Sequence, residues 1–163
     1  MKNILFVILV LFSIIITNNA KSSSNVDTIL VDFHGGWLYY RDNRFPVVLP
    51  KNQFPLPVTG IVTRLDRYPT WYPTPNTRAS MPGLPKVVPY GHRLNAMGEG
   101  RIVMDFNESW MRNTALQFVR IHGNANPHEL HQRKSRGCIR MLDSDIILLM
   151  EMIKNQKPLI FFY

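Results

Sequence analysis

The sequence predicts a mainly β domain with about six to eight short strands and one α-helix near its C-terminus. Three observations lead to this fold class. Apolar residues occur in short runs that turn signals such as Gly35-Gly36 separate. Twelve residues are proline, which interrupts helices. Only residues 143–155 have apolar side chains at helical spacing.

Two turns organise the beginning of the domain. Apolar residues in 26–33 indicate a first strand, Gly35-Gly36 indicates a turn, and 37–40 returns as a second strand. Asp42-Asn43 marks the next turn, before the apolar segment 45–49. The prolines that follow limit regular pairing, because proline cannot donate to a strand ladder: Pro50, Pro55 and Pro57.

Residues 68–89 are predicted to form a long ordered loop. The segment is rich in proline and also carries Trp71 and Tyr72, whose rings favour packing over disorder. Loops of this length in a compact domain are often functional. We therefore expect this loop to be the candidate lid of a site.

The remaining strands are predicted at 101–106, 116–121 and 158–163, and the second of them runs directly into His122. The helix 143–155 lies before the last strand, with Asp143 or Ser144 as its N-cap. Its apolar face follows i, i+3, i+4, i+7 spacing: Ile146, Leu149, Met150 and Ile153.

The N-terminus reads as a secretory signal peptide, residues 1–20, followed by a polar lead-in, 21–25, and one domain, 26–163. Lys2 precedes the apolar run from Ile4 to Ile16, which is too short to cross a bilayer of about 30 Å. An uncleaved N-terminal anchor is the alternative. Both readings predict export, and cleavage leaves no stable membrane span.

The formal net charge of +8 indicates anionic partners. The basic residues are spread along the chain, so a generally solvated surface accounts for most of them. Export argues against nucleic acid as the partner and leaves anionic wall polymers or membrane headgroups.

Cys138 is the only cysteine, and His122 lies upstream of it. A lone thiol beside a glycine, with a histidine on a neighbouring segment, is typical of an activated nucleophile. The alternative is a buried structural cysteine. Nearby positive charge would favour the reactive thiolate, and this stretch offers Arg133, Lys134, Arg136 and Arg140.

One run of residues closely resembles the signature of the L,D-transpeptidase (YkuD-type) catalytic domain. It consists of Ile121-His122-Gly123, then Ser135-Arg136-Gly137-Cys138-Ile139-Arg140-Met141, with Asp143 and Asp145 after it. Residues 72–78, 84–89 and 95–98 resemble further segments of that family, so the likeness covers 26–163. The resemblance implies a YkuD-like β-sandwich of short strands with one C-terminal helix.

The same resemblance implies a reaction and its residues. Cys138 would attack the peptidoglycan stem tetrapeptide before D-Ala and form a thioester, and His122 would be the general acid/base. The carbonyl of Gly123 would orient His122, and the N–H groups of Gly137 and Cys138 would stabilise the oxyanion. No cofactor and no metal are implied.

Three further residues are candidates for substrate binding. Many family members carry a histidine where this chain has Arg136, which cannot act as a base, so we expect Arg136 to contact substrate or to lower the thiol pKa. Arg140 would hold a substrate carboxylate or form an ion pair with Asp143 or Asp145. Ser135 would contact substrate or serve as a turn residue.

The resemblance implies peptidoglycan stem peptides as partners and the periplasm as location. The acyl group would pass to another stem peptide (a 3-3 cross-link), to an outer-membrane lipoprotein, or to water in an L,D-carboxypeptidase. A non-catalytic peptidoglycan-binding module is a rival function. A zinc site is another, with the ligand set His122, His128, His131 and Cys138.

Overall fold

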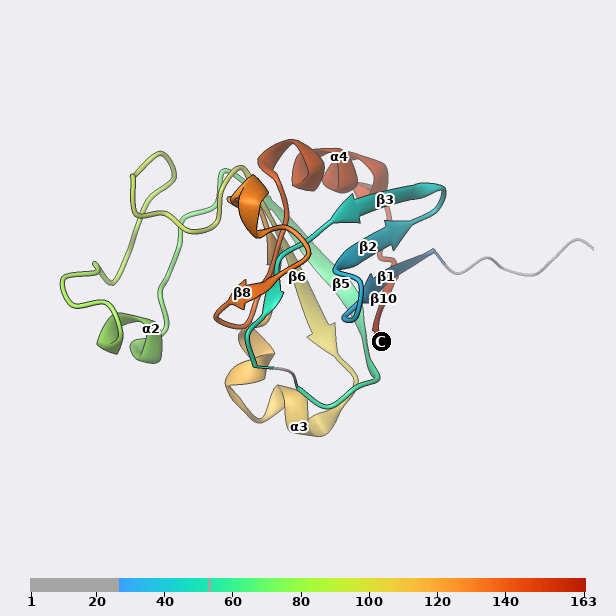
Figure 1. The fold of residues 1–163 in the computed structure, drawn as a ribbon, viewed down its shortest axis with the longest axis horizontal. Coiled ribbons are helices and arrows are strands. Elements are labelled where there is room, and N and C mark those ends of the chain that lie inside the picture. Colours follow the sequence, from blue (N-terminus) through green and yellow to red (C-terminus); the bar gives the residue numbers. More distant parts are fainter. Residues whose placement is uncertain (1–26, 53) are drawn as a thin grey trace, which may run out of the picture.

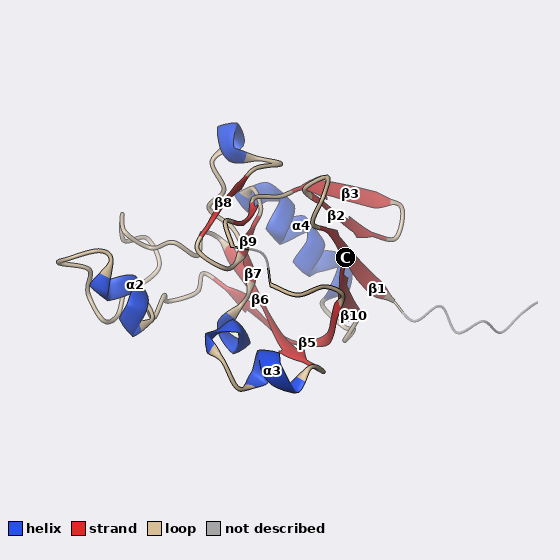
Figure 2. Ribbon diagram, turned by 60° about the horizontal axis from the view of Figure 1, so that its bottom comes forward, coloured by secondary structure: helices blue, strands red, loops and turns tan. Residues whose placement is uncertain are grey.

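The computed structural model describes residues 27–52 and 54–163. The expected signal peptide, residues 1–20, and the lead-in, 21–25, lie outside the described residues. Within that part of the chain, no helix is long and apolar enough to cross a membrane. The mainly β prediction is confirmed, because most elements are strands of one curled sheet (Figures 1 and 2).

The main sheet has eight strands in the order β3-β2-β1-β10-β5-β6-β7-β9. Two neighbouring pairs are parallel, β1 with β10 and β7 with β9, and the other pairs are antiparallel. The strands are β1 (Thr28–Asp32), β2 (Trp37–Tyr40), β3 (Asn43–Pro46), β5 (Val58–Arg67), β6 (Gly100–Phe106), β7 (Ile121–His122), β9 (Ile139–Arg140) and β10 (Leu159–Phe162).

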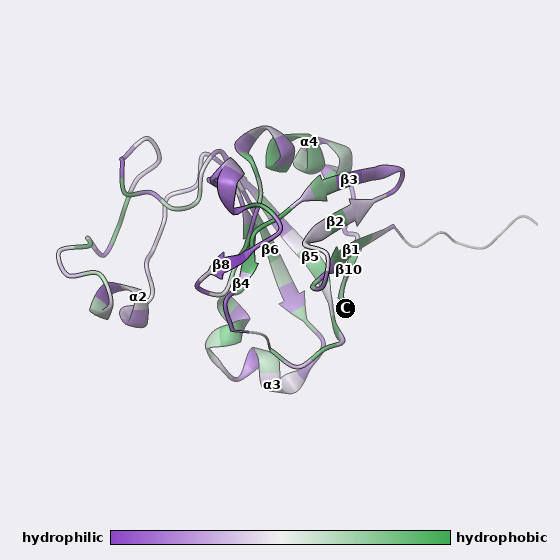
Figure 3. Ribbon diagram, in the orientation of Figure 1, coloured by the Kyte–Doolittle hydropathy of each residue, from purple (hydrophilic) through white to green (hydrophobic). Residues whose placement is uncertain are grey.

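A short segment after β3 joins the two edges of this sheet. Val47 N donates to Gly36 O (2.9 Å) beside the β3 edge, and Val48 N donates to Arg140 O (2.9 Å) at the β9 edge. β4 (Leu49–Pro50) then pairs with β8 (Arg133–Ser135) as a second, two-stranded sheet. The strand β8 is hydrophilic (Figure 3). The main sheet is therefore held in a curl whose edges are bridged.

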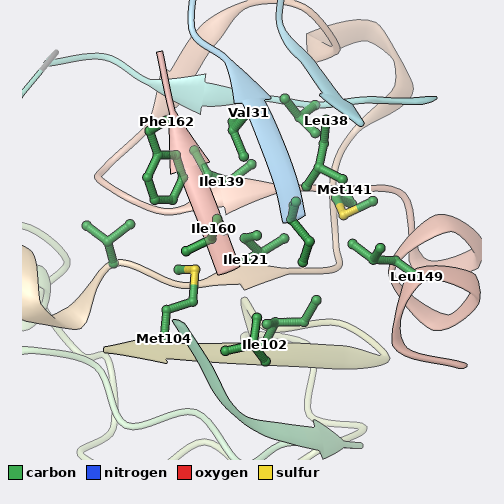
Figure 4. Packing of buried hydrophobic residues seen from close by; sticks show 14 of the residues in the cluster. Val31, Leu38, Ile102, Met104, Ile121, Ile139, Met141, Leu149, Ile160 and Phe162 are labelled. Carbon is green, nitrogen blue, oxygen red and sulfur yellow. The ribbon is translucent and has the colours of Figure 1, made fainter. Parts of the chain in front are cut away.

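The core lies inside this curl and draws side chains from both ends of the sheet. Figure 4 shows Val31 and Ile160 packed together with Ile121 and Ile139. All four are buried. Burial of each such side chain contributes about 1.5–3 kcal/mol, so the two short strands β7 and β9 are anchored by the core rather than by their length.

α4 (Asp143–Ile153) covers the sheet on one side (Figure 1). Its predicted apolar face is confirmed, because the four residues at helical spacing are buried. The predicted cap is wrong. The N-cap is Leu142, which makes no side-chain cap bond. The Asp143 carboxylate instead accepts bonds from backbone outside the helix, from Glu99 N and Asn124 N (both 2.9 Å).

The predicted strand 116–121 is wrong over most of its length. α3 (Ser109–Arg112) leads into the 3₁₀ helix η1 (Ala115–Phe118), and only β7 pairs in the sheet. The Thr114 side chain accepts from Leu116 N (3.2 Å) and so starts a helical turn. The apolar side chains of this segment do not share one buried face, since Phe118 is 52% exposed.

The ten-residue strand β5 was not predicted. Its inner half alternates, with Val58, Gly60 and Val62 buried, but charged residues fill its outer half and a bulge follows Val62. Gly60 is required by close packing, because a Cβ there would lie 2.5 Å from the carbonyl oxygen of Asp105 on β6.

The proline-rich segment is an excursion away from the body of the domain (Figures 1 and 2). It is mainly irregular, with one short helix, α2 (Pro75–Ala79). Its base is braced by paired backbone bonds between Trp71 and Val88 (2.8 and 2.9 Å). Asn95 Nδ2 adds bonds to Pro69 O (3.0 Å) and Val88 O (3.1 Å). The excursion is therefore ordered at its attachment.

Candidate active site

Two adjacent parallel strands bring Cys138 and His122 together. In the register of β7 and β9, Ile121 pairs with Ile139 and His122 pairs with Arg140. Side chains alternate along a strand, and the two isoleucines point into the core. His122 and Arg140 therefore lie on the other side. Cys138 comes one residue before β9, opposite Arg120, and Ile139 N donates to Arg120 O (2.9 Å).

His122 is buried, with 3% of its surface exposed, and its Nδ1 lies 2.9 Å from Gly123 O. A carbonyl oxygen only accepts, so Nδ1 carries the proton and Nε2 is left with its lone pair. Burial lowers the pKa of His122 to about 4, and the charges of Arg140 and Arg101 act in the same direction. The imidazole is therefore neutral at pH 7 and can accept a proton.

Cys138 is half-buried, and its Sγ lies 3.9 Å from Phe118 O. Burial raises the pKa of this thiol, although the backbone of Arg120 and the charges of Arg120, Arg140 and Arg101 oppose that rise. The site thus holds a neutral thiol and, on the adjacent strand, a neutral imidazole that can accept a proton.

The positive charge at this thiol comes partly from residues that the sequence analysis did not single out. Arg101, on β6, pairs with His122 across the sheet and forms an ion pair with Asp66 (2.6 Å). Arg120 donates from Nη1 to Gln117 O (2.6 Å) and Val119 O (2.7 Å). Among the described residues, no carboxylate forms an ion pair with Arg120. Its position two residues before His122 was the only available signal.

The loop before Cys138 is shaped by Ser135. The Ser135 side chain is buried, its hydroxyl donates to Cys138 O, and Gly137 N donates back to Ser135 Oγ (3.3 Å). Gly137 has a φ of +156°, where a side chain would be strained. Within the described chain, the N–H of Cys138 has no protein acceptor, whereas that of Gly137 is used inside the loop. Ser135 thus serves as a turn residue.

The two other candidate substrate-binding residues are engaged with protein groups. Arg136 is exposed, and its Nη1 lies 2.8 Å from the Met81 Sδ of the excursion. Arg140 forms an ion pair with Glu129 (2.6 Å) and not with either of the two expected aspartates. Its Nε is buried without a hydrogen-bond partner in the described structure. Arg136 therefore links the loop before Cys138 to the excursion, and Arg140 is held against the 124–132 segment.

The rival zinc set is not assembled. Across residues 27–52 and 54–163, no three His, Cys, Asp or Glu side chains form a group that could hold a metal ion. His131 instead places Nδ1 3.1 Å from Gly35 O, and its ring lies 4.5 Å from the ring of Trp37. Of the four suggested ligands, only His122, on β7, and Cys138, one residue before β9, belong to this site.

The sequence matches the family model of the L,D-transpeptidase catalytic domain (YkuD) over residues 28–160. No curated protein matches the chain at a significant level. Among solved structures, an L,D-transpeptidase from Mycobacterium smegmatis is similar with a TM-score of 0.58 and 11% identity, over 85% of this chain and 58% of that chain.

Two more solved structures share the fold. The Ldtfm–avibactam carbamoyl enzyme has a TM-score of 0.57 and 18% identity, over 85% of this chain and 49% of that one. L,D-transpeptidase 3 from Mycobacterium tuberculosis, in complex with a faropenem-derived adduct, has a TM-score of 0.51 and 11% identity. That match covers 84% of this chain and 60% of the other chain. The chain thus spans about half to three fifths of the length of these proteins.

Proposed function

The chain belongs to the L,D-transpeptidase catalytic-domain family, and on that premise we propose that it is an exported cysteine acyltransferase acting on peptidoglycan stem tetrapeptides. One observation carries the proposal. The only thiol of the chain lies one residue before β9, and a buried neutral imidazole lies on the adjacent parallel strand β7, with its Nδ1 held by Gly123 O (2.9 Å). That arrangement leaves Nε2 as the proton acceptor.

The first half-reaction forms a thioester. As the Cys138 sulfur attacks the carbonyl carbon that precedes D-Ala, His122 Nε2 takes the thiol proton. The tetrahedral intermediate places negative charge on the former carbonyl oxygen, for which the free N–H of Cys138 is a donor. The carbon–nitrogen bond then breaks, His122 returns the proton to the departing amine, and D-Ala leaves.

The second half-reaction transfers the acyl group. An acceptor amine attacks the thioester, His122 takes a proton from that amine, and the sulfur leaves and regains the proton as a thiol. Acid–base catalysis of this kind typically contributes about 10²–10⁴-fold, and one oxyanion donor about 10²–10³-fold in kcat. Each step uses only the two side chains and the backbone donor.

The charge around the site suits an anionic substrate. Arg101 and Arg140 are paired with carboxylates, but Arg120 has no ion-pair partner among the described residues. Stem peptides carry free carboxylates, and the guanidinium group recognises carboxylates with a pair of parallel hydrogen bonds. We therefore assign Arg120 as a side chain available to attract the stem peptide, in addition to Arg136.

The acceptor defines three versions of this function. An amine on a neighbouring stem gives a 3-3 cross-link, a lysine of an outer-membrane lipoprotein gives an attached lipoprotein, and water gives a trimmed stem. All three place the domain in the periplasm. The rival function is a peptidoglycan-binding module without catalysis, which would retain the fold but form no thioester.

The test is intact mass spectrometry of the purified protein after incubation with a disaccharide-tetrapeptide. Wild type should gain the mass of an acyl group and release D-Ala, whereas Cys138→Ala and His122→Ala should do neither. His128→Ala, which removes an exposed histidine, is the matched control and should behave as wild type. Folded wild-type protein with a reduced thiol, no adduct and no D-Ala would support the binding module instead.

A second reagent tests the nucleophile alone. Two structural relatives are recorded as a carbamoyl enzyme with avibactam and with a faropenem-derived adduct. A carbapenem-type β-lactam offers a strained acyl group, so it should acylate Cys138 here. Acylation that persists in Cys138→Ala would place the nucleophile elsewhere.

A further inference from the structure

We propose that Asp143 is a positioning residue for the general base His122, acting through the peptide group that joins Gly123 to Asn124. The inference rests on the proposed function and adds a residue to its machinery. Two hydrogen bonds define the connection. His122 Nδ1–H donates to Gly123 O (2.9 Å), and Asn124 N–H donates to Asp143 Oδ1 (2.9 Å).

These two bonds involve opposite ends of one peptide unit. The carbonyl of Gly123 and the N–H of Asn124 share a conjugated plane, so electron density moves between them. A carboxylate at the N–H end makes the carbonyl oxygen a stronger acceptor, and hydrogen bonds in such a chain strengthen one another. The charge of Asp143 therefore reaches His122 without direct contact between the side chains.

The position of Asp143 is fixed by its surroundings. Its Oδ1 also accepts from Glu99 N (2.9 Å), so one carboxylate oxygen ties two loops together. Both loops place a glycine against that oxygen, and a Cβ at either position would lie 2.2 Å (Gly98) or 2.1 Å (Gly123) from Oδ1. Asp143 is also the first residue of α4, where a negative charge is favoured by the helix dipole.

Asp143 opposes the other charges that face His122. Arg101 on β6 and Arg140 on β9 disfavour a positive imidazole, as does burial, whereas Asp143 on α4 favours it. The Cys138 thiol and Arg120 complete the set of titratable and charged groups near the pair. When His122 takes the thiol proton it becomes positive in this environment. Asp143 is then the nearby negative charge that stabilises the imidazolium.

The decisive variant is Asp143→Asn, because asparagine keeps the size of the side chain and an oxygen that can accept from both N–H groups. A purely structural role would survive this change, whereas a charge acting through the peptide would not. Charge-assisted hydrogen bonds are about twice as strong as neutral ones. We expect acylation of Cys138 by a carbapenem-type β-lactam to slow by about tenfold, with the unfolding transition little changed.

The pH profile separates the electrostatic role from packing. Removing the negative charge lowers the pKa of His122 further, so the acid limb of the acylation rate should move to lower pH in Asp143→Asn. Asp143→Ala also loses both backbone bonds and should be slower and less stable. The matched control is Asp145→Asn, which makes the same charge change in the same helical turn, where the Asp145 carboxylate accepts a hydrogen bond from Ser144 Oγ (3.3 Å). It should keep the wild-type rate and profile.

Outcomes for the two proposals are distinguishable. Absence of acylation in wild type would overturn the proposed function. Acylated wild type together with an unchanged rate and pH profile in Asp143→Asn would overturn only the role of Asp143. In a third outcome, Asp143→Asn is acylated more slowly, unfolds under milder conditions and keeps the acid limb of its pH profile unchanged. That result would show that Asp143 has only a structural role.

Discussion

Acidification should destabilise the fold through His122 more than through any surface histidine. The imidazole is buried and its pKa in the folded chain is about 4, against an ordinary pKa of 6.5 for histidine. A proton therefore favours the unfolded chain, so the contribution of the neutral imidazole to stability is complete above pH 6.5 and is lost as the pH falls toward 4. Integrating the difference from pH 8 to pH 5 gives about 2 kcal/mol.

The assay is urea unfolding of the purified protein at pH 8 and at pH 5, followed by tryptophan fluorescence. The comparison variant is His122→Asn, whose side-chain amide can still donate to Gly123 O but does not titrate. Between pH 8 and pH 5, the free energy of unfolding should fall by about 2 kcal/mol more in wild type than in the variant. This corresponds to a shift of roughly 1 M in the urea midpoint. At pH 5 the carboxylates with lowered pKa values, such as Asp66, remain ionised.

The control replaces the exposed His128 by asparagine and must retain the wild-type difference. Equal losses of free energy in wild type and His122→Asn would refute the reasoning, because they would show that protonating His122 costs nothing in the folded state. The imidazole would then be charged or solvated, and its role as a neutral base would need another explanation.

Three further changes have defined outcomes. Arg120→Gln should slow alkylation of Cys138 by iodoacetamide by up to about tenfold at neutral pH, because the thiolate loses a nearby charge; a rate equal to wild type would contradict this. Gly60→Ala should lower the free energy of unfolding by about 1–3 kcal/mol in thermal denaturation, since its Cβ meets the Asp105 carbonyl. Glu129→Gln should lower the free energy of unfolding by about 1 kcal/mol in the same thermal denaturation, because it leaves Arg140 without its ion-pair partner. High salt should reduce this difference.

Elements whose apolar pattern is uninterrupted along the sequence could be predicted from it. The strand 37–40 coincides with β2, and the helix 143–155 contains α4 with the expected apolar face. β5 escaped prediction because Arg64 and Asp66, in its outer half, interrupt its apolar pattern. The segment 116–121 failed for the opposite reason, since its apolar residues mimic a strand while Thr114 starts a helical turn.

The residues of the site also fall into those that the sequence could identify and those that it could not. Cys138 and His122 could be singled out because a lone thiol and its motif are local features of the sequence. Arg101 and Arg120 could not, because their proximity depends on the register of β6, β7 and β9. Asp143 was predicted as a helix cap or as an ion-pair partner of Arg140. The hydrogen bonds from Glu99 N and Asn124 N, and the two glycines packed against its carboxylate, show another use.

The position of β10 sets the order in which this domain can fold. The strand lies between β1 and β5, so the N-terminal strand gains its parallel neighbour only from residues 159–162. A ribosome delivering the chain from its N-terminus leaves a gap in the middle of the sheet until those residues emerge. Pairing over such a sequence separation is slow. The eight-stranded sheet is therefore complete only once residues 159–162 have paired with both β1 and β5.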